Sequence, residues 1–199
     1  MRKNLRIILF LLVAVIQLFI PAQMILSKQL AMNIGQEFKF RVEARDPYDP
    51  FRGRYLRINV EEEAIPVDDK YDYIGGQRVF VLIDKDTEGF ARIAGVSPIA
   101  PSEGVYIKTK VNYVEHRFNN ENSSTSDQRV IHVVFPFDRY YMPETQAPLA
   151  EKVYNEKIRD TNAKVYVTVR ILNGDAVLDR LFIDDETIEE FIKKHDDRK

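Results

Sequence analysis

The N-terminal segment Ile7–Leu26 constrains this chain most, because it is an apolar run long enough to cross a membrane. Its sequence, IILFLLVAVIQLFIPAQMIL, covers 20 residues, and only Gln17, Pro21 and Gln23 weaken its apolar character. About 20 apolar residues, at a rise of ~1.5 Å each, span the hydrocarbon core of a bilayer. We therefore predict that residues 1–28 form a short head followed by a single transmembrane helix.

The charges around this segment predict its orientation. Arg2, Lys3 and Arg6 precede it, and the positive-inside rule places such a head in the cytoplasm. The rest of the chain would then lie outside the cytoplasm, held by one span in the cell inner (cytoplasmic) membrane. Lys28 follows the span, where a lysine can reach the bilayer edge with its ammonium group. A cleaved signal peptide is the alternative; Pro21-Ala22 matches a cleavage site poorly, and either route delivers the domain to the same side.

Charge and cysteine usage exclude several classes of function. The 199 residues include 29 Lys+Arg and 31 Asp+Glu, and without Arg2, Lys3 and Arg6 the remainder has 26 against 31, a net charge of −5. Without a basic surplus, nucleic acid is not an expected partner. The absence of cysteine excludes disulfides, thiol nucleophiles, thiolate zinc sites and a lipoprotein anchor. The three histidines have no metal-ligand spacing, so we expect no metal and no cofactor.

The remainder of the chain predicts a mainly β (α+β) fold with antiparallel strands. Apolar and polar residues alternate with the period of a half-buried strand in several segments. Turn residues separate two pairs of such segments into hairpins, one around KDTEG and one around Asn173-Gly174. Helical spacing predicts a helix near 148–159 and a short C-terminal helix. The predicted strands and hairpin arms are 37–45, 54–60, 78–84, 89–96, 105–114, 129–137, 163–172 and 176–183.

Two parts of the chain resemble one another. PFRGRYL (Pro50–Leu56) is similar to PFDRYYM (Pro136–Met142), and the hairpin at 79–96 is similar to the hairpin at 165–181. The single-residue difference between the hairpins falls at the turn, where changes in length are tolerated. One interpretation is a duplicated β unit, with a first unit at 29–115 and a second unit with a helix at 128–199. The other is that two amphipathic hairpins look alike without common ancestry.

The segment GRYLRINV (Gly53–Val60) resembles the motif that names the GDYXXLXY family of bacterial membrane-anchored proteins. DPYDPFR before it and RYYMPE (Arg139–Glu144) resemble further segments of that family, in the same order along the chain. The motif's Asp, Leu and final Tyr are Arg54, Ile58 and Val60 here. The resemblance implies an N-terminal anchor, an extracytoplasmic domain and an association with a multi-span membrane protein. It implies no established activity.

The candidate site residues come from these two corner segments. Asp46 and Asp49 precede prolines or open turns, where a carboxylate usually binds its own backbone, although paired carboxylates also bind Ca²⁺ or act as acid and base. Gly53 suits a positive φ or close packing, and Tyr55 suits an edge position with its hydroxyl satisfied. No catalytic residue is predicted. The candidate binding residues are Asp46, Asp49, Arg52, Gly53, Tyr55, Arg139, Tyr140, Pro143 and Glu144.

Three functions remain compatible with the sequence. The first is a non-enzymatic interaction module that contacts a multi-span membrane protein or another envelope protein. The second is an envelope hydrolase that uses carboxylates among Asp46, Asp49 and Glu144. The third is a domain that binds a small ligand or a cell-wall fragment between the two β units. A shared site requires that the two corner segments, near Tyr55 and near Arg139, lie together in the fold.

Overall fold

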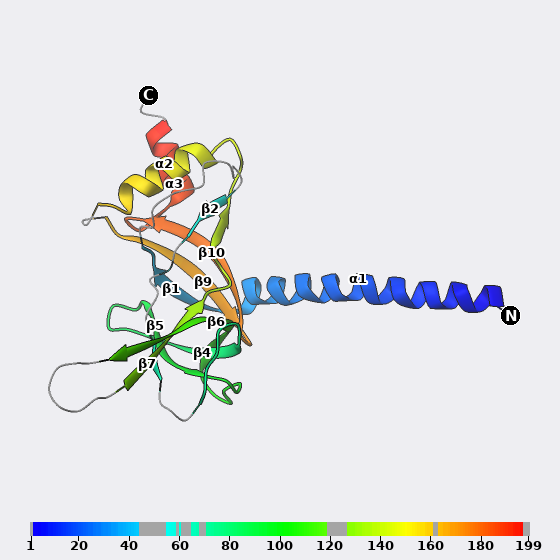
Figure 1. Cartoon of the computed structure of the whole chain (residues 1–199). Coiled ribbons are helices and arrows are strands. Elements are labelled where there is room, and N and C mark those ends of the chain that lie inside the picture. Colours follow the sequence, from blue (N-terminus) through cyan, green and yellow to red (C-terminus); the bar gives the residue numbers. More distant parts are fainter. Residues whose placement is uncertain are drawn as a thin grey trace.

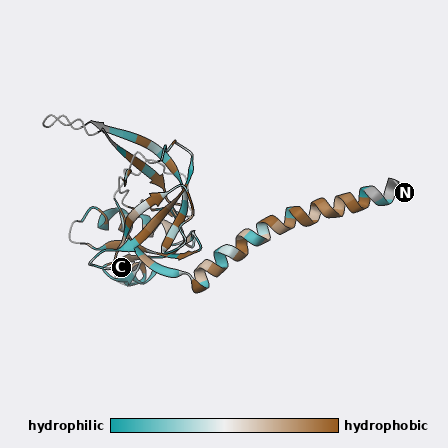
Figure 2. Cartoon of the chain, turned by 90° about the horizontal axis from the view of Figure 1, so that it is seen from below, coloured by the Kyte–Doolittle hydropathy of each residue, from teal (hydrophilic) through white to brown (hydrophobic). Residues whose placement is uncertain are grey.

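The structure is a computed structural model that describes residues 2–43, 55–58, 60, 65–67, 71–118, 127–160 and 163–196. Its most prominent element is helix α1 (Arg2–Ile34), which extends away from the β-rich body (Figure 1). Most of the helix surface is apolar (Figure 2), and none of the residues in its most apolar window is buried. By length and composition, the stretch Arg6–Ile34 is able to cross a membrane.

The last turns of α1 pack directly on the body. Ala31 is fully buried, and the Lys28 ammonium donates a hydrogen bond to the Ala176 carbonyl at 3.1 Å. Gly35 follows the helix, and a Cβ built there would lie 2.2 Å from the Ala31 carbonyl oxygen and 3.1 Å from the Ile171 amide nitrogen. Helix and body therefore meet without a linker, since the first strand begins at Gln36.

One sheet has the strand order β1-β9-β10-β11. Its elements are β1 (Gln36–Arg41), β9 (Val165–Leu172), β10 (Asp175–Ile183) and β11 (Glu186–Thr187), all antiparallel. The predicted hairpin is β9–β10, and Asn173 and Gly174 both have positive φ (51° and 86°), as a type I′ turn requires. Its tip reaches the other sheet, where the Gly174 carbonyl accepts a hydrogen bond from the Lys108 amide at 2.9 Å.

The second sheet has the order β3-β7-β6-β4-β5. It consists of β3 (Ile65–Val67), β4 (Arg78–Lys85), β5 (Ala91–Ser97), β6 (Val105–Phe118) and β7 (Asp127–Val134). The hairpin predicted around KDTEG is β4–β5. Strand β3 lies outside the predicted strands and forms the edge of the sheet beside β7. Pro66 is tolerated there because one side of an edge strand has no hydrogen-bond partner that needs a backbone donor.

A two-stranded ribbon and two helices form the opposite end of the body from this second sheet (Figure 1). The ribbon pairs β2 (Tyr55–Arg57) with β8 (Arg139–Tyr141). Helix α2 (Ala147–Lys157) lies close to its predicted position, and α3 (Ile188–Asp196) is the predicted C-terminal helix. Ala150, Val153 and Tyr154 of α2 are buried, as are Ile188 and Ile192 of α3.

The two sheets, the ribbon and the helices share one hydrophobic core. The Phe40 ring of β1 packs against two rings that follow β7, with its centre 5.8 Å from that of Phe135 and 5.1 Å from that of Phe137. These contacts connect the two sheets. The predicted fold class is confirmed: a long apolar N-terminal helix is followed by antiparallel β-sheets and two short helices. The division into units at 29–115 and 128–199 stays a prediction, and β1 and β7 each pair with strands of the other stretch.

Candidate functional site

The two corner segments meet in the ribbon. Its antiparallel register places Tyr55 opposite Tyr141, Leu56 opposite Tyr140 and Arg57 opposite Arg139. The Ile58 amide then donates to the Asp138 carbonyl at 2.9 Å and extends the pairing by one residue. The structure therefore joins Tyr55, Arg139 and Tyr140, three candidates from segments far apart in the sequence.

The ribbon has a buried face and an exposed face. Leu56 (3% exposed) and Tyr140 (8% exposed) face the core. Because directly paired residues lie on the same face of a sheet, the remaining four residues lie on the other. This exposed surface, which we call the Tyr–Arg face, consists of Tyr55, Arg57, Arg139 and Tyr141.

Aromatic and cationic groups contact one another on the Tyr–Arg face. The Tyr55 and Tyr141 rings lie 5.8 Å apart, and the Arg139 guanidinium carbon lies 5.0 Å from the Tyr55 ring centre. The Tyr141 hydroxyl, followed by the Asp138 carboxylate 3.6 Å away, raises the pKa of Arg139 above its ordinary value. The side chain of Arg139 nevertheless remains half exposed, and Tyr141 is 67% exposed. The face therefore presents two rings and two permanent positive charges to the surroundings.

Tyr140 fixes the ribbon to the C-terminal helix. Its hydroxyl donates to the Glu189 carboxylate at 2.5 Å, at the first turn of α3. Burial, followed by this carboxylate, raises the pKa of the Tyr140 hydroxyl, so that it remains a protonated donor. Tyr140 therefore has a structural contact, whereas its neighbours Arg139 and Tyr141 point outward.

The structure describes two of the six remaining candidate residues. Pro143 and Glu144 are exposed and lie in the turn between β8 and α2, where the Pro143 carbonyl accepts hydrogen bonds from the Gln146 and Ala147 amides. Asp46, Asp49, Arg52 and Gly53 lie outside the described residues.

Sequence reasoning did not select Arg57, Tyr141 and Glu189. Arg57 and Tyr141 could have been found from the alternation within RYLRINV and RYYM, which places them on the same faces as Tyr55 and Arg139 respectively. Glu189 gave no comparable signal, because its contact with Tyr140 depends on the packing of α3 against the ribbon.

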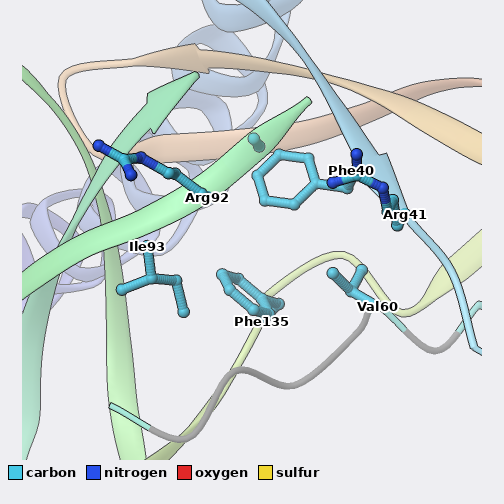
Figure 3. Close-up of a pocket in the computed structure, with 7 residues that line it drawn as sticks. Phe40, Arg41, Val60, Arg92, Ile93 and Phe135 are labelled. Atoms are coloured by element: carbon cyan, nitrogen blue, oxygen red, sulfur yellow. The ribbon is translucent and has the colours of Figure 1, made fainter. Parts of the chain in front are cut away.

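A small hollow lies between the two sheets (Figure 3). It is lined by Phe40, Arg41, Val60, Ala91, Arg92, Ile93 and Phe135, and its volume is about 20 Å³. That volume holds about one water molecule, whereas small-ligand sites usually occupy several hundred Å³. Arg41 is also engaged at its rim, since it binds Asp86 and Glu88, each at 2.7 Å. The hollow therefore does not suit a cell-wall fragment.

Among the residues that the structure describes, no group of three or more His, Asp and Glu side chains is arranged to hold a metal ion. His132 is instead buried in β7, where its ring stacks on Tyr113 at 4.2 Å and its Nε2 lies 3.1 Å from the Glu115 carboxylate. These contacts indicate a structural role for His132.

Comparison with known proteins gives one match. The sequence model of a family described as "GDYXXLXY protein" matches residues 17–181, which include most of α1, the ribbon, both sheets as far as Leu181 and helix α2. No curated protein and no solved structure matches the chain.

Proposed function

The chain belongs to the GDYXXLXY protein family, and from this premise we propose that it is a membrane-anchored interaction module for a multi-span membrane protein or another envelope protein. In this proposal α1 crosses the cytoplasmic membrane once, and the β-rich body lies outside the cytoplasm. Two features support the anchoring: the length and exposure of the apolar helix, and the cationic head that precedes it.

The observation that carries the interaction role is the Tyr–Arg face. Tyrosine and arginine are enriched at the energetic centres of protein interfaces, because each combines a large contact area with directed hydrogen bonding. Here two strands from distant segments place two of each on one exposed surface. The residues are also held by backbone pairing, which reduces the ordering cost of binding.

The charges of this face indicate the chemistry of its partner. Arg57 and Arg139 are directly opposite, and like charges in that position destabilise a strand pair. Carboxylates from a partner would offset this repulsion and accept paired hydrogen bonds from each guanidinium group. We therefore expect a partner segment that contributes Asp or Glu, together with apolar area for the two tyrosine rings.

The two alternative functions have less support. A hydrolase would need carboxylates that converge; Glu144 is exposed, and Asp46 and Asp49 lie outside the described residues, so this function stays a prediction. The small-ligand function would need a pocket, and the hollow near Phe40 is too small for that role.

The proposal is tested by recovering partners of the full-length chain from detergent-solubilised native membranes. The double variant Arg139→Ala with Tyr141→Ala removes half of the Tyr–Arg face. We expect the wild-type chain to recover an integral membrane protein. The double variant should recover at least about tenfold less of that protein, because the loss of interface residues that contribute ~2 kcal/mol or more weakens binding by that factor or more.

Arg92→Ala with Tyr113→Ala is the matched control. Both residues are exposed to a similar degree, but they belong to β5 and β6 of the second sheet. Recovery that is unchanged in the control and lost in the test variant supports the proposal. Equal loss in both, or no membrane protein recovered by the wild-type chain at native expression, contradicts it.

A further inference from the structure

A second exposed surface lies on β4 and β6 of the second sheet. Strand pairing places Arg78 opposite Lys110 and Phe80 opposite Lys108, so the alternation of β4 and β6 brings all four side chains to one face. Arg78, Lys108 and Lys110 are exposed. Asp84, further along β4, shares this face, and its carboxylate pairs with Arg92 of β5 at 3.3 Å. In the described part of the chain, none of the three cations forms an ion pair. We call these three residues the cationic face.

Apolar area adjoins the cationic face. Val134 of β7 is paired with Lys110 and is 51% exposed, and Phe80 is partly exposed between the cations. Cations beside exposed apolar side chains are typical of surfaces that rest in the headgroup region of a bilayer, where charge meets phosphate and apolar groups meet the upper acyl chains.

The cationic face is connected to α1 through the tip of the β9–β10 hairpin. The Gly174 carbonyl binds the Lys108 amide, and a Cβ at Gly174 would lie 2.6 Å from the Lys108 Cγ. Two residues further along, the Ala176 carbonyl accepts the hydrogen bond from Lys28 of α1.

The position of Lys28 along α1 indicates where this connection would lie relative to the bilayer. It follows the last residue of the apolar run, Leu26, by two positions, or ~3 Å along the helix axis. The polar headgroup region extends several Å beyond the hydrocarbon core. If α1 spans the membrane, the hairpin tip and Lys108 therefore lie at headgroup level.

We propose that the cationic face binds the anionic headgroups of the membrane that α1 enters, so that the body rests on the bilayer in one orientation. This inference rests on the proposed anchoring by α1. The direct packing of Ala31 against the body, with no linker before β1, holds the cationic face in place. The Tyr–Arg face belongs to the opposite end of the body and would remain available to a protein partner (Figure 1).

The test uses the full-length chain in vesicles of phosphatidylcholine with or without phosphatidylglycerol. Because the chain has no cysteine, Val134→Cys provides a single attachment site for a nitroxide label beside Lys110. We expect the label to lose accessibility to a water-soluble relaxation agent when phosphatidylglycerol is present, and to regain it in high salt, which screens surface charge. A label at Glu88→Cys, on the β4–β5 turn, should remain accessible in both lipids.

Charge variants test whether the three cations cause the lipid dependence. Arg78→Gln, Lys108→Gln and Lys110→Gln together should abolish the lipid dependence at position 134, while the two lysines changed to arginine should retain it. Flotation after an alkaline carbonate wash reports the anchoring independently. Vesicle-bound protein whose label is equally accessible in both lipids overturns the inference and leaves the anchoring intact; protein that does not float with the vesicles overturns both.

Discussion

At the scale of single residues, two buried tyrosines near the ribbon differ in one contact. The Tyr140 hydroxyl donates to Glu189, whereas the Tyr154 hydroxyl is buried with no hydrogen-bond partner among the described residues. A hydrogen bond to a charged group contributes about 1.5–3 kcal/mol, and an unsatisfied buried hydroxyl contributes nothing favourable. The two residues therefore form a matched pair for substitution by phenylalanine.

We predict that Tyr140→Phe lowers the free energy of unfolding by about 1.5–3 kcal/mol, because the Glu189 carboxylate loses its donor. Tyr154→Phe should leave the free energy of unfolding unchanged or raise it slightly. Denaturant unfolding of both full-length variants in the same detergent measures the difference. Equal effects of the two substitutions would show that the Tyr140–Glu189 hydrogen bond does not hold the ribbon to α3.

Gly174 combines a positive φ with close contact to the second sheet. We predict that Gly174→Ala lowers the free energy of unfolding by more than about 2 kcal/mol, since backbone strain adds to overlap with Tyr106 and Lys108. Gly76→Ala is the control, with φ +82° and no atom within 4 Å of the added Cβ, and should cost only about 1 kcal/mol. If thermal or denaturant unfolding gives equal losses, the hairpin tip is not tightly packed on β6.

Some residue roles could be predicted from sequence and others could not. The sequence predicts a hairpin turn at Asn173-Gly174 because the conformational requirement of such a turn is local. The second role of Gly174, contact with β6, depends on how two sheets pack and leaves no local signal. Lys28 shows the same limit: its position after the apolar run predicts a lysine at the bilayer edge, but its hydrogen bond to Ala176 comes from the docking of α1 on β10.

At the scale of elements, an ion-pair cluster ties β1 to the turn of the β4–β5 hairpin. The Arg41 guanidinium donates to the Asp86 carboxylate at 2.7 Å and holds the pKa of Asp86 below its ordinary value; the Phe90 and Glu88 amides donate to the other oxygen of the carboxylate. A carboxyl whose pKa is lower in the folded state stabilises the fold above the unfolded-state pKa, and this contribution is lost as pH falls through the folded-state pKa.

We therefore predict that the unfolding midpoint of the wild-type protein falls as pH drops below about 4. Asp86→Asn should be less stable at neutral pH and should lose less stability over that acid range. Unfolding curves measured at a series of pH values test this, with Glu103→Gln in the exposed loop before β6 as the control. An acid dependence in Asp86→Asn as steep as in the wild-type protein would contradict the assignment.

The junction between α1 and the body gives a further prediction. Gly35→Ala places a Cβ against the Ala31 carbonyl and the Ile171 amide, and overpacking of this kind costs about 1–3 kcal/mol. We expect faster amide hydrogen exchange in the last turn of α1 and at Ile171, with the second sheet little changed. Gly95→Ala in β5 has no atom within 4 Å of the new Cβ and should leave exchange at the junction unchanged. Unaltered exchange in Gly35→Ala would indicate a flexible junction.

Most elements were predictable because their apolar periodicity is local. The two hairpins, α2, α3 and the long apolar helix all follow from spacing within short windows. Strand β2 lies within the predicted strand 54–60, but its pairing with β8 depends on a distant segment and gives no local signal. Strand β3 was not predicted, because three residues define no period. The similarity between PFRGRYL and PFDRYYM marked both strands of the ribbon, but only the fold shows that they pair.

At the scale of the whole molecule, the chain is one body built on one core, to which α1 is directly attached. The body carries two exposed surfaces of different character. The cationic face lies on the second sheet, connected to α1 by the β9–β10 tip, and the Tyr–Arg face lies on the ribbon beside α2 and α3 (Figure 1). In our account the first orients the body on lipid and the second receives a protein partner.

Site-specific photo-crosslinking in intact cells tests whether the Tyr–Arg face contacts a membrane protein. A photoreactive amino acid replaces Tyr141 on the Tyr–Arg face or Tyr113 on β6 in otherwise wild-type protein. We predict one discrete adduct with an integral membrane protein from position 141, which is lost when Arg57 and Arg139 are changed to glutamate, and no such adduct from position 113. The same adducts from both positions, or an adduct at 141 that survives the arginine substitutions, would contradict it.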